Sequence, residues 1–179
     1  MGVDNFSYGS DLVGFVKAES TYGVPIKPAG ADAFRASNIT LGAPVDRQFP
    51  NDVRGSRSRI QQVDGRTPVQ PWSADGILRP SGSAGTAPDI NVFLKHGLGT
   101  ETVAGGSSVT YSILADTTIY SSAIYRKVTD LTEGVSGAIV QNISLNWTGD
   151  SFVTWTCSGI GKDYIQTGNS AVNGTAGAA

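Results

Sequence analysis

The chain is poor in charge, cysteine and histidine, and each shortage excludes a class of site. Cys157 is the only cysteine and His96 the only histidine, so neither an intrachain disulfide nor a zinc site with paired Cys and His ligands is expected. Charged residues make up 16% of the 179 residues, against about 25% in an average soluble domain. The net charge of −2 gives no general attraction for nucleic acid.

Catalytic motifs are missing too. The sequence has no G-x-S-x-G elbow, no glycine-rich loop ending in Lys-Ser/Thr, and no EF-hand calcium loop. His96 falls at the end of a predicted helix, where contact with terminal carbonyl groups is a better interpretation than a place in a catalytic triad. We therefore expect a protein that is not an enzyme and needs no metal or cofactor.

Long apolar runs are also lacking. Residues 1–6 do not combine a basic region with an apolar stretch, and no segment approaches the roughly 18 consecutive apolar residues of a membrane span. We expect neither a secretory leader nor a membrane anchor.

What the chain does have is glycine and short polar side chains. Glycine accounts for 23 residues, well above the usual share of about 7%. This composition is typical of a mainly β protein with many turns. We predict a polar arm over 1–14, a β-sandwich or partial barrel over 15–166, and a low-complexity segment over 167–179. Strands are expected within 15–25, 34–41, 107–114, 117–127, 137–147 and 152–160.

One short helix is predicted over 87–96. Thr86 and Asp89 have the spacing of a capping box, and Pro88 suits a first helical turn. Gly97 and Gly99 are expected to end the helix. Its apolar face, predicted to lie in the core, consists of Ile90, Phe93 and Leu94.

The segment 142–158 alternates with a period of two around the polar turn 148–151, which predicts a β-hairpin. One side is expected in the core: Ile143, Leu145, Trp147, Val153, Trp155 and Cys157. The other side is short, polar and uncharged: Asn142, Ser144, Asn146, Thr154 and Thr156. Solvated strands usually carry Lys and Glu, so this second face needs an explanation.

A long segment with little periodicity, 42–71, holds a concentration of positive charge. Its arginines are Arg47, Arg54, Arg57, Arg59 and Arg66. They could grip phosphate, pair with nearby acids such as Asp46, Asp52 and Asp64, or contact a neighbouring subunit. Loops of this length usually contact something, and we expect an ordered contact between subunits.

Three phrases, taken in order, resemble the tail tube proteins of long, non-contractile-tailed bacteriophages. They are Ala18-Glu-Ser-Thr-Tyr-Gly23, the stretch from Pro80 to Thr100, and the late β block from Gly137 to Lys162. The resemblance implies a β-sandwich with a flanking helix that assembles into hexameric rings, and the rings stack into a hollow tube. It also implies a place in the virion tail, assembled in the host cytoplasm, with a tape measure protein and with terminator and tail-tip proteins as partners.

In such a tube the uncharged hairpin face is expected to line the lumen. Double-stranded DNA would pass without specific binding, because each Lys or Arg on phosphate would hold the duplex by counterion release. Two other classes stay open. One is a carbohydrate-binding or adhesin-like β-sandwich that uses Trp72, Trp147 and Trp155 as sugar platforms. The other is a β-sandwich hydrolase.

Overall fold

The structure, a computed structural model, describes residues 12–42, 47–48, 63–64, 69–113, 118–128 and 131–168. The expected arm over 1–14 lies mostly outside this part of the chain, and Leu12 to Gly14 already belong to the first strand. The expected segment 167–179 is described only to Gly168, where the last strand ends. Over these residues the fold is mainly β with one α-helix, as the composition and the strand pattern predicted.

Eight strands form one hydrogen-bonded sheet. Their order is β2-β1-β9-β10-β11-β6-β3, and β12 also pairs with β10. Their bounds are β1 (Leu12–Ala18), β2 (Ala33–Phe34), β3 (Asn38–Leu41), β6 (Gln70–Ile77), β9 (Ser122–Val128), β10 (Leu131–Asn146), β11 (Thr154–Gly161) and β12 (Asp163–Gly168). Two separate pairs are β4 (Arg47–Gln48) with β5 (Val63–Asp64), and β7 (Gly99–Ala104) with β8 (Ser108–Ile113).

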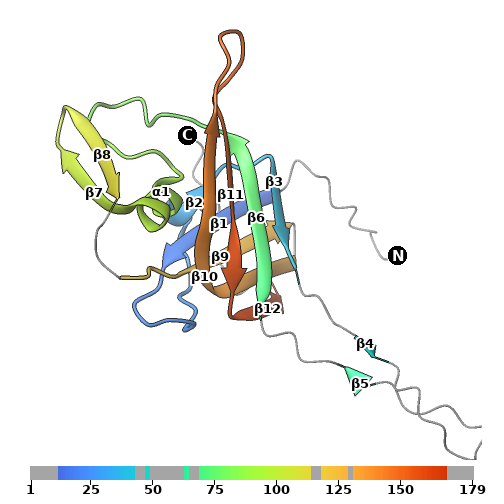
Figure 1. Cartoon of the computed structure of the whole chain (residues 1–179). Coiled ribbons are helices and arrows are strands. Elements are labelled where there is room, and N and C mark those ends of the chain that lie inside the picture. The colour runs from blue at the N-terminus through green and yellow to red at the C-terminus, as the bar shows by residue number, and fades with distance from the viewer. Residues whose placement is uncertain are drawn as a thin grey trace, which may run out of the picture.

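Strand β10 is shared by two layers. Its first half pairs with β9 and β12, and its second half, from Ile139 to Asn146, pairs with β11. Between the halves Gly137 has a φ of 63°, a conformation that glycine adopts without steric cost. The register shifts there as well, so the sheet folds over on itself and encloses the core (Figure 1).

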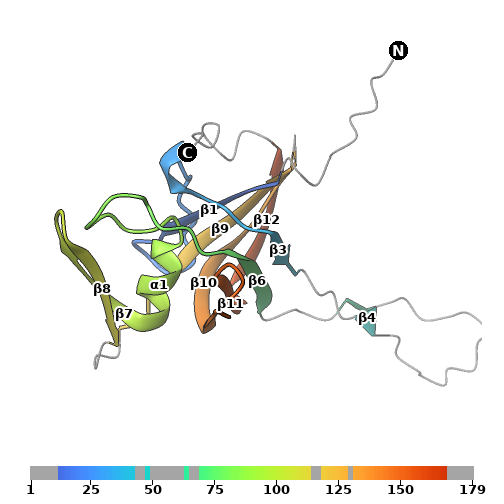
Figure 2. The ribbon, with the colours of Figure 1, turned by 90° about the horizontal axis from the view of Figure 1, so that it is seen from above.

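An aromatic cluster fills the space between the layers. Phe93 of α1 (Asn91–Leu98) stacks between Trp72 and Trp155, with ring centroids 5.7 and 5.8 Å apart, and meets Phe34 edge-on at 5.0 Å. Figure 2 shows α1 between the β7–β8 hairpin and the sheet. Of the side chains expected in the core, five are buried and two are partly buried. The buried ones are Ile90, Phe93, Leu94, Trp155 and Cys157, and the partly buried ones are Ile143 and Val153.

The prediction that Leu145 and Trp147 lie in the core is wrong. Leu145 is 38% exposed and Trp147 is 72% exposed. The alternation placed them on the apolar side of the hairpin, but β10 and β11 continue beyond the core to a projecting turn (Figure 1). Sequence periodicity gives the side of a strand, whereas the length of the neighbouring elements decides where the core ends.

The helix differs from its prediction at both ends. It begins at Asn91 rather than at 87, and no side chain caps it; the Asp89 carboxylate accepts a hydrogen bond from the backbone N–H of Arg35. It also runs through Gly97, and Gly99, with a φ of 112°, ends it. A Cβ at Gly97 would lie 3.2 Å from Ile143, so this glycine lets the helix pack closely on β10.

Five strands were not predicted. They are β4, β5, β6, β7 and β12. β6 contains a proline and a glycine, which weaken strand patterns, and it takes up the end of the expected loop 42–71 from Gln70 onward. β4 and β5 pair within the same loop.

Candidate functional site: a polar sheet face

Four neighbouring strands carry one continuous polar face. Across β10, β11, β6 and β3 the register aligns two rows of side chains. The rows are Asn142–Ser158–Ser73–Thr40 and Ser144–Thr156–Asp75–Asn38. Asn146 and Thr154, which face each other, extend this polar face toward the hairpin turn. The polar positions expected from sequence on two strands therefore continue over two more strands, of which β6 was not predicted.

The residues of the polar face are short and reach solvent. Their side chains are exposed or half-buried, and Asp75 is the one charged residue in the two rows. Hydroxyl and amide groups bind water well. The rows contain no cation that could neutralise phosphate, so the face can be wetted by water but cannot hold a polyanion by counterion release.

Burial on the opposite side fixes the orientation of this polar face. Ile143, Cys157, Ala74 and Ile39 form a cross-strand apolar row between the two polar rows. A slip of one residue would turn this row outward, so the register is strongly specified. Burial also raises the pKa of the Cys157 thiol to about 12, so the thiol is inert.

The same four strands have two lateral edges. No described strand pairs with β10 beyond Ala138 on the side where β9 lies, and β3 ends the sheet at the other side. One carbonyl at that outer edge, that of Ile39, accepts a hydrogen bond of 3.0 Å from the Arg126 guanidinium. Unpaired strand edges favour association with another chain.

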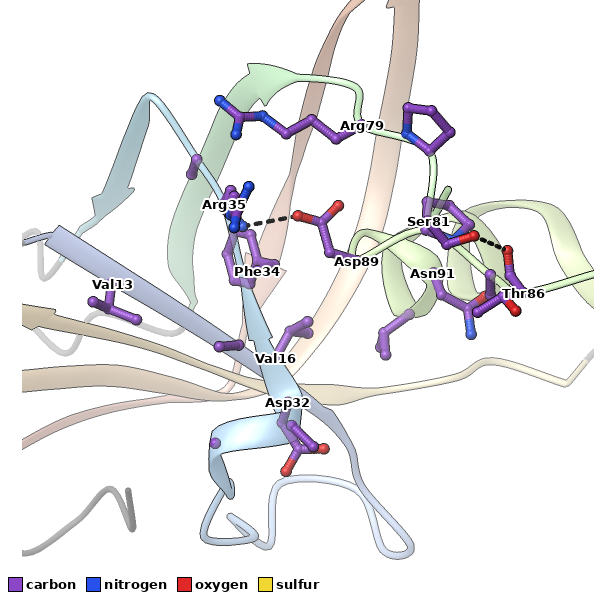
Figure 3. A pocket seen from close by; sticks show the side chains of 18 of the residues that line it. Val13, Val16, Asp32, Phe34, Arg35, Arg79, Ser81, Thr86, Asp89 and Asn91 are labelled. Carbon is purple, nitrogen blue, oxygen red and sulfur yellow. Dashed lines mark hydrogen bonds between the residues drawn. The ribbon is translucent and has the colours of Figure 1, made fainter. Parts of the chain in front are cut away.

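A second candidate, a cleft of about 940 Å³, lies between β1, the segment 30–36 and the segment 79–92 (Figure 3). Its two carboxylates already have partners. Asp32 pairs with Lys17 at 2.9 Å, and Asp89 accepts the Arg35 N–H at 3.2 Å. These groups hold the local chain, and the cleft contains neither histidine nor cysteine.

The described residues include no cluster of three or more His, Cys, Asp or Glu that could hold a metal ion. His96 stacks on the ring of Tyr120, with centroids 5.4 Å apart. Burial, helped by the neighbouring Lys95, lowers the pKa of His96 to about 4. The imidazole is therefore neutral near pH 7 and has no favourable charge interaction with the helix end.

Among the described helices, none is long and apolar enough to cross a membrane.

The three tryptophans do not form a shared surface on which a sugar could stack. Trp72 and Trp155 lie in the core, which leaves Trp147 as the exposed one. Of the arginines expected between subunits, Arg54, Arg57, Arg59 and Arg66 fall outside the described residues. Only the backbone of Arg47 is described, opposite Asp64.

Comparison with known proteins shows which solved structures have a similar fold. No family model and no curated protein matches the sequence. Among solved structures, the chain is similar to one from the sheath–tube complex of an extracellular contractile injection system, PVC, in its extended state. The TM-score is 0.53 and the identity is 6%, over 93% of this chain and 94% of that one. A chain of the anti-feeding prophage tube-terminating cap is similar with a TM-score of 0.52 and 8% identity, over 94% and 95%. The chain therefore shares its fold with components of phage-like tube assemblies.

Proposed function

We propose that this chain is the tail tube subunit of a long, non-contractile-tailed bacteriophage, with a structural rather than an enzymatic role. Copies close into rings of about six, and the rings stack into a tube through which double-stranded DNA leaves the virion. The observation that carries the proposal is the continuous polar face across β10, β11, β6 and β3, whose two rows contain no cation. The shared fold and the sequence phrases support the same role.

Strand direction allows a ring to close. Neighbours among these four strands are antiparallel throughout, so β10 and β6 run one way and β11 and β3 the other. If β3 of one copy lies beside β10 of the next, that junction is antiparallel too. Because Arg126 occupies the Ile39 carbonyl, we expect this junction to combine main-chain pairing with side-chain contacts.

The dimensions and chemistry suit a conduit. About six copies with four strands each give a barrel far wider than the roughly 16–18 strands that already leave an aqueous channel. With the apolar row toward the core of each subunit, the polar rows face the lumen. The residues in this role are Asn142, Ser144, Asn146, Thr154 and Thr156.

The proposed partners follow from this role. A tape measure protein would occupy the lumen during assembly, and terminator and tail-tip proteins would bind the two ends of the tube. The segment 42–71 with its arginines would contact a neighbouring copy. Assembly in the host cytoplasm is part of the same proposal.

The decisive experiment is electron microscopy of the purified full chain, together with mass measurement, with and without a tail-tip nucleus. We expect hollow tubes and a ring of about six copies. A protein that stays monomeric at all concentrations, even with the nucleus, contradicts the proposal. Glycan binding by such a monomer would favour the adhesin-like alternative.

A further inference from the structure

The loop after β1 is held in place by one carboxylate. Glu19 accepts hydrogen bonds from the backbone N–H of Gly23 at 2.9 Å, the hydroxyl of Ser121 at 2.8 Å and the backbone N–H of Gly137 at 2.9 Å. Charge-assisted bonds of this kind are roughly twice as strong as neutral ones. The loop is therefore fixed to the bend of β10 rather than free to move.

This anchored loop presents apolar and positive groups to solvent. Tyr22 and Val24 are each 53% exposed. The Lys162 ammonium lies 5.7 Å from the centre of the Tyr22 ring, and Lys162 and Lys27 are both exposed. We call the set Tyr22, Val24, Lys27 and Lys162 the platform.

The turn between β10 and β11 is apolar and negative. Trp147 and Phe152 are 72% and 74% exposed, and Asp150 between them is exposed and has no ion pair among the described residues. The turn has a defined shape, because the Ser151 N–H binds the Thr148 carbonyl at 3.3 Å. We call Trp147, Asp150 and Phe152 the tip.

The tip and the platform lie at opposite ends of the same strand. β11 begins just after the tip, at Thr154, and ends at Gly161, directly before Lys162. Eight residues of strand span about 25 Å. In Figure 1 the hairpin turn projects at the top, while the end of β11 and the loop after β1 lie at the bottom.

We propose that the tip of one copy packs on the platform of a second copy, end to end along the strands. Both surfaces expose aromatic side chains, and their charges are complementary, with Asp150 on one and Lys162 and Lys27 on the other. Two different surfaces at opposite ends make a heterologous contact that does not close, and such contacts generate filaments. The inference rests on the proposed function, for which it supplies the contact between stacked rings.

The charge pattern identifies the second copy as the occupant. Asp150 at the centre of the tip opposes insertion into an anionic lipid surface, since the tip carries no cation. The stacking contact uses the ends of the strands, whereas ring closure uses the sides of β10 and β3. A defect in stacking and a defect in ring closure can therefore be told apart.

Cysteine crosslinking of the full chain tests the contact directly. Gly149→Cys lies in open space within the hairpin turn and Thr21→Cys lies on the exposed loop beside the platform, while native Cys157 is buried. Under mild oxidation during assembly, the double variant is expected to give a ladder of covalent oligomers, and either single variant at most dimers. Pairing Gly149→Cys with Gly105→Cys, an equally open glycine at the β7–β8 turn, is the matched control and should give no ladder. Tubes without a crosslinked ladder in the first pair overturn the inference.

Side-chain variants give an independent test. The double variant Trp147→Ser with Phe152→Ser should still form rings of six. The amount of protein assembled into tubes should fall at least tenfold. The control Ile113→Ser with Ile119→Ser, two exposed apolar residues outside the tip, should assemble normally.

Asp150→Lys should block stacking, and adding Lys162→Asp should restore it. Normal tubes from the Trp147/Phe152 variant contradict this contact and leave the proposed function standing, whereas the absence of rings and tubes in the unmodified chain overturns both.

Discussion

The Glu19 carboxylate and the backbone N–H of Gly137, 118 residues apart in sequence, are joined by a hydrogen bond of 2.9 Å. Gly137 is the point at which β10 bends from one layer into the other. The bond therefore ties the loop after β1 to the fold of the sheet. It also gives a physical role to the glutamate in the phrase from Ala18 to Gly23.

We predict that Glu19→Ala destabilises the monomer by about 3 kcal/mol, because it leaves three donors without their acceptor and buried unpaired groups are costly. Urea unfolding measures the change. Asp163→Ala, an exposed acid on β12, is the matched control and should change stability by less than about 0.5 kcal/mol. Equal effects of the two substitutions would show that the anchor contributes nothing particular.

The two hairpin tryptophans should behave differently. Trp155 is fully buried and stacks on Phe93, so Trp155→Ala should cost about 3–5 kcal/mol. Trp147 is mostly exposed, and Trp147→Ala should change monomer stability by less than about 0.5 kcal/mol. Thermal or urea unfolding of the monomer compares them. A large loss for Trp147→Ala would mean that the turn packs on the rest of the monomer.

These two residues also show how far the sequence could lead. The period of two identified the hairpin and its polar side, because side chains alternate across any strand. It could not show that β10 and β11 extend beyond the core, since this depends on where β6 and α1 end. Pro71 and Gly76 weaken the strand pattern of β6, so this strand was not predicted. Its position between β11 and β3 also includes a pairing with a strand far away in sequence, β11. The full width of the polar face therefore required the structure.

The neutral state of His96 predicts a dependence of stability on pH. Burial lowers its pKa to about 4 in the folded state, from 6.5. The unfolded chain then binds more protons between these values, so this contribution is complete above pH 6.5 and is lost as the pH falls toward 4. From pH 7 to 4.5 the loss is about 2–3 kcal/mol. His96→Phe, which keeps a ring against Tyr120, should remove that part, and unfolding of both proteins at both pH values measures it. An equal pH effect in the two proteins contradicts the assignment.

The lumen assignment can be tested with added charge. Asn146→Lys with Thr154→Lys places a cross-strand cation pair on the polar face of β10 and β11, about twelve charges in each ring of six. Thr102→Lys with Thr110→Lys is a matched pair, because these two threonines are exposed and face each other across β7 and β8. Both variants should fold and form tubes, since none of the four side chains is buried.

Counterion release should make both Lys variants bind duplex DNA more tightly, and less so as salt rises. Only the Asn146/Thr154 variant should hold the DNA inside the tube, where a nuclease cannot reach it. Short duplexes are therefore incubated with assembled tubes at low and high salt, treated with nuclease, and the surviving DNA is measured. Protection by the Asn146/Thr154 variant, and none by the Thr102/Thr110 variant or the unmodified tubes, is the expected result. DNA that is equally sensitive in both Lys variants means that the polar face of β10 and β11 does not line the lumen.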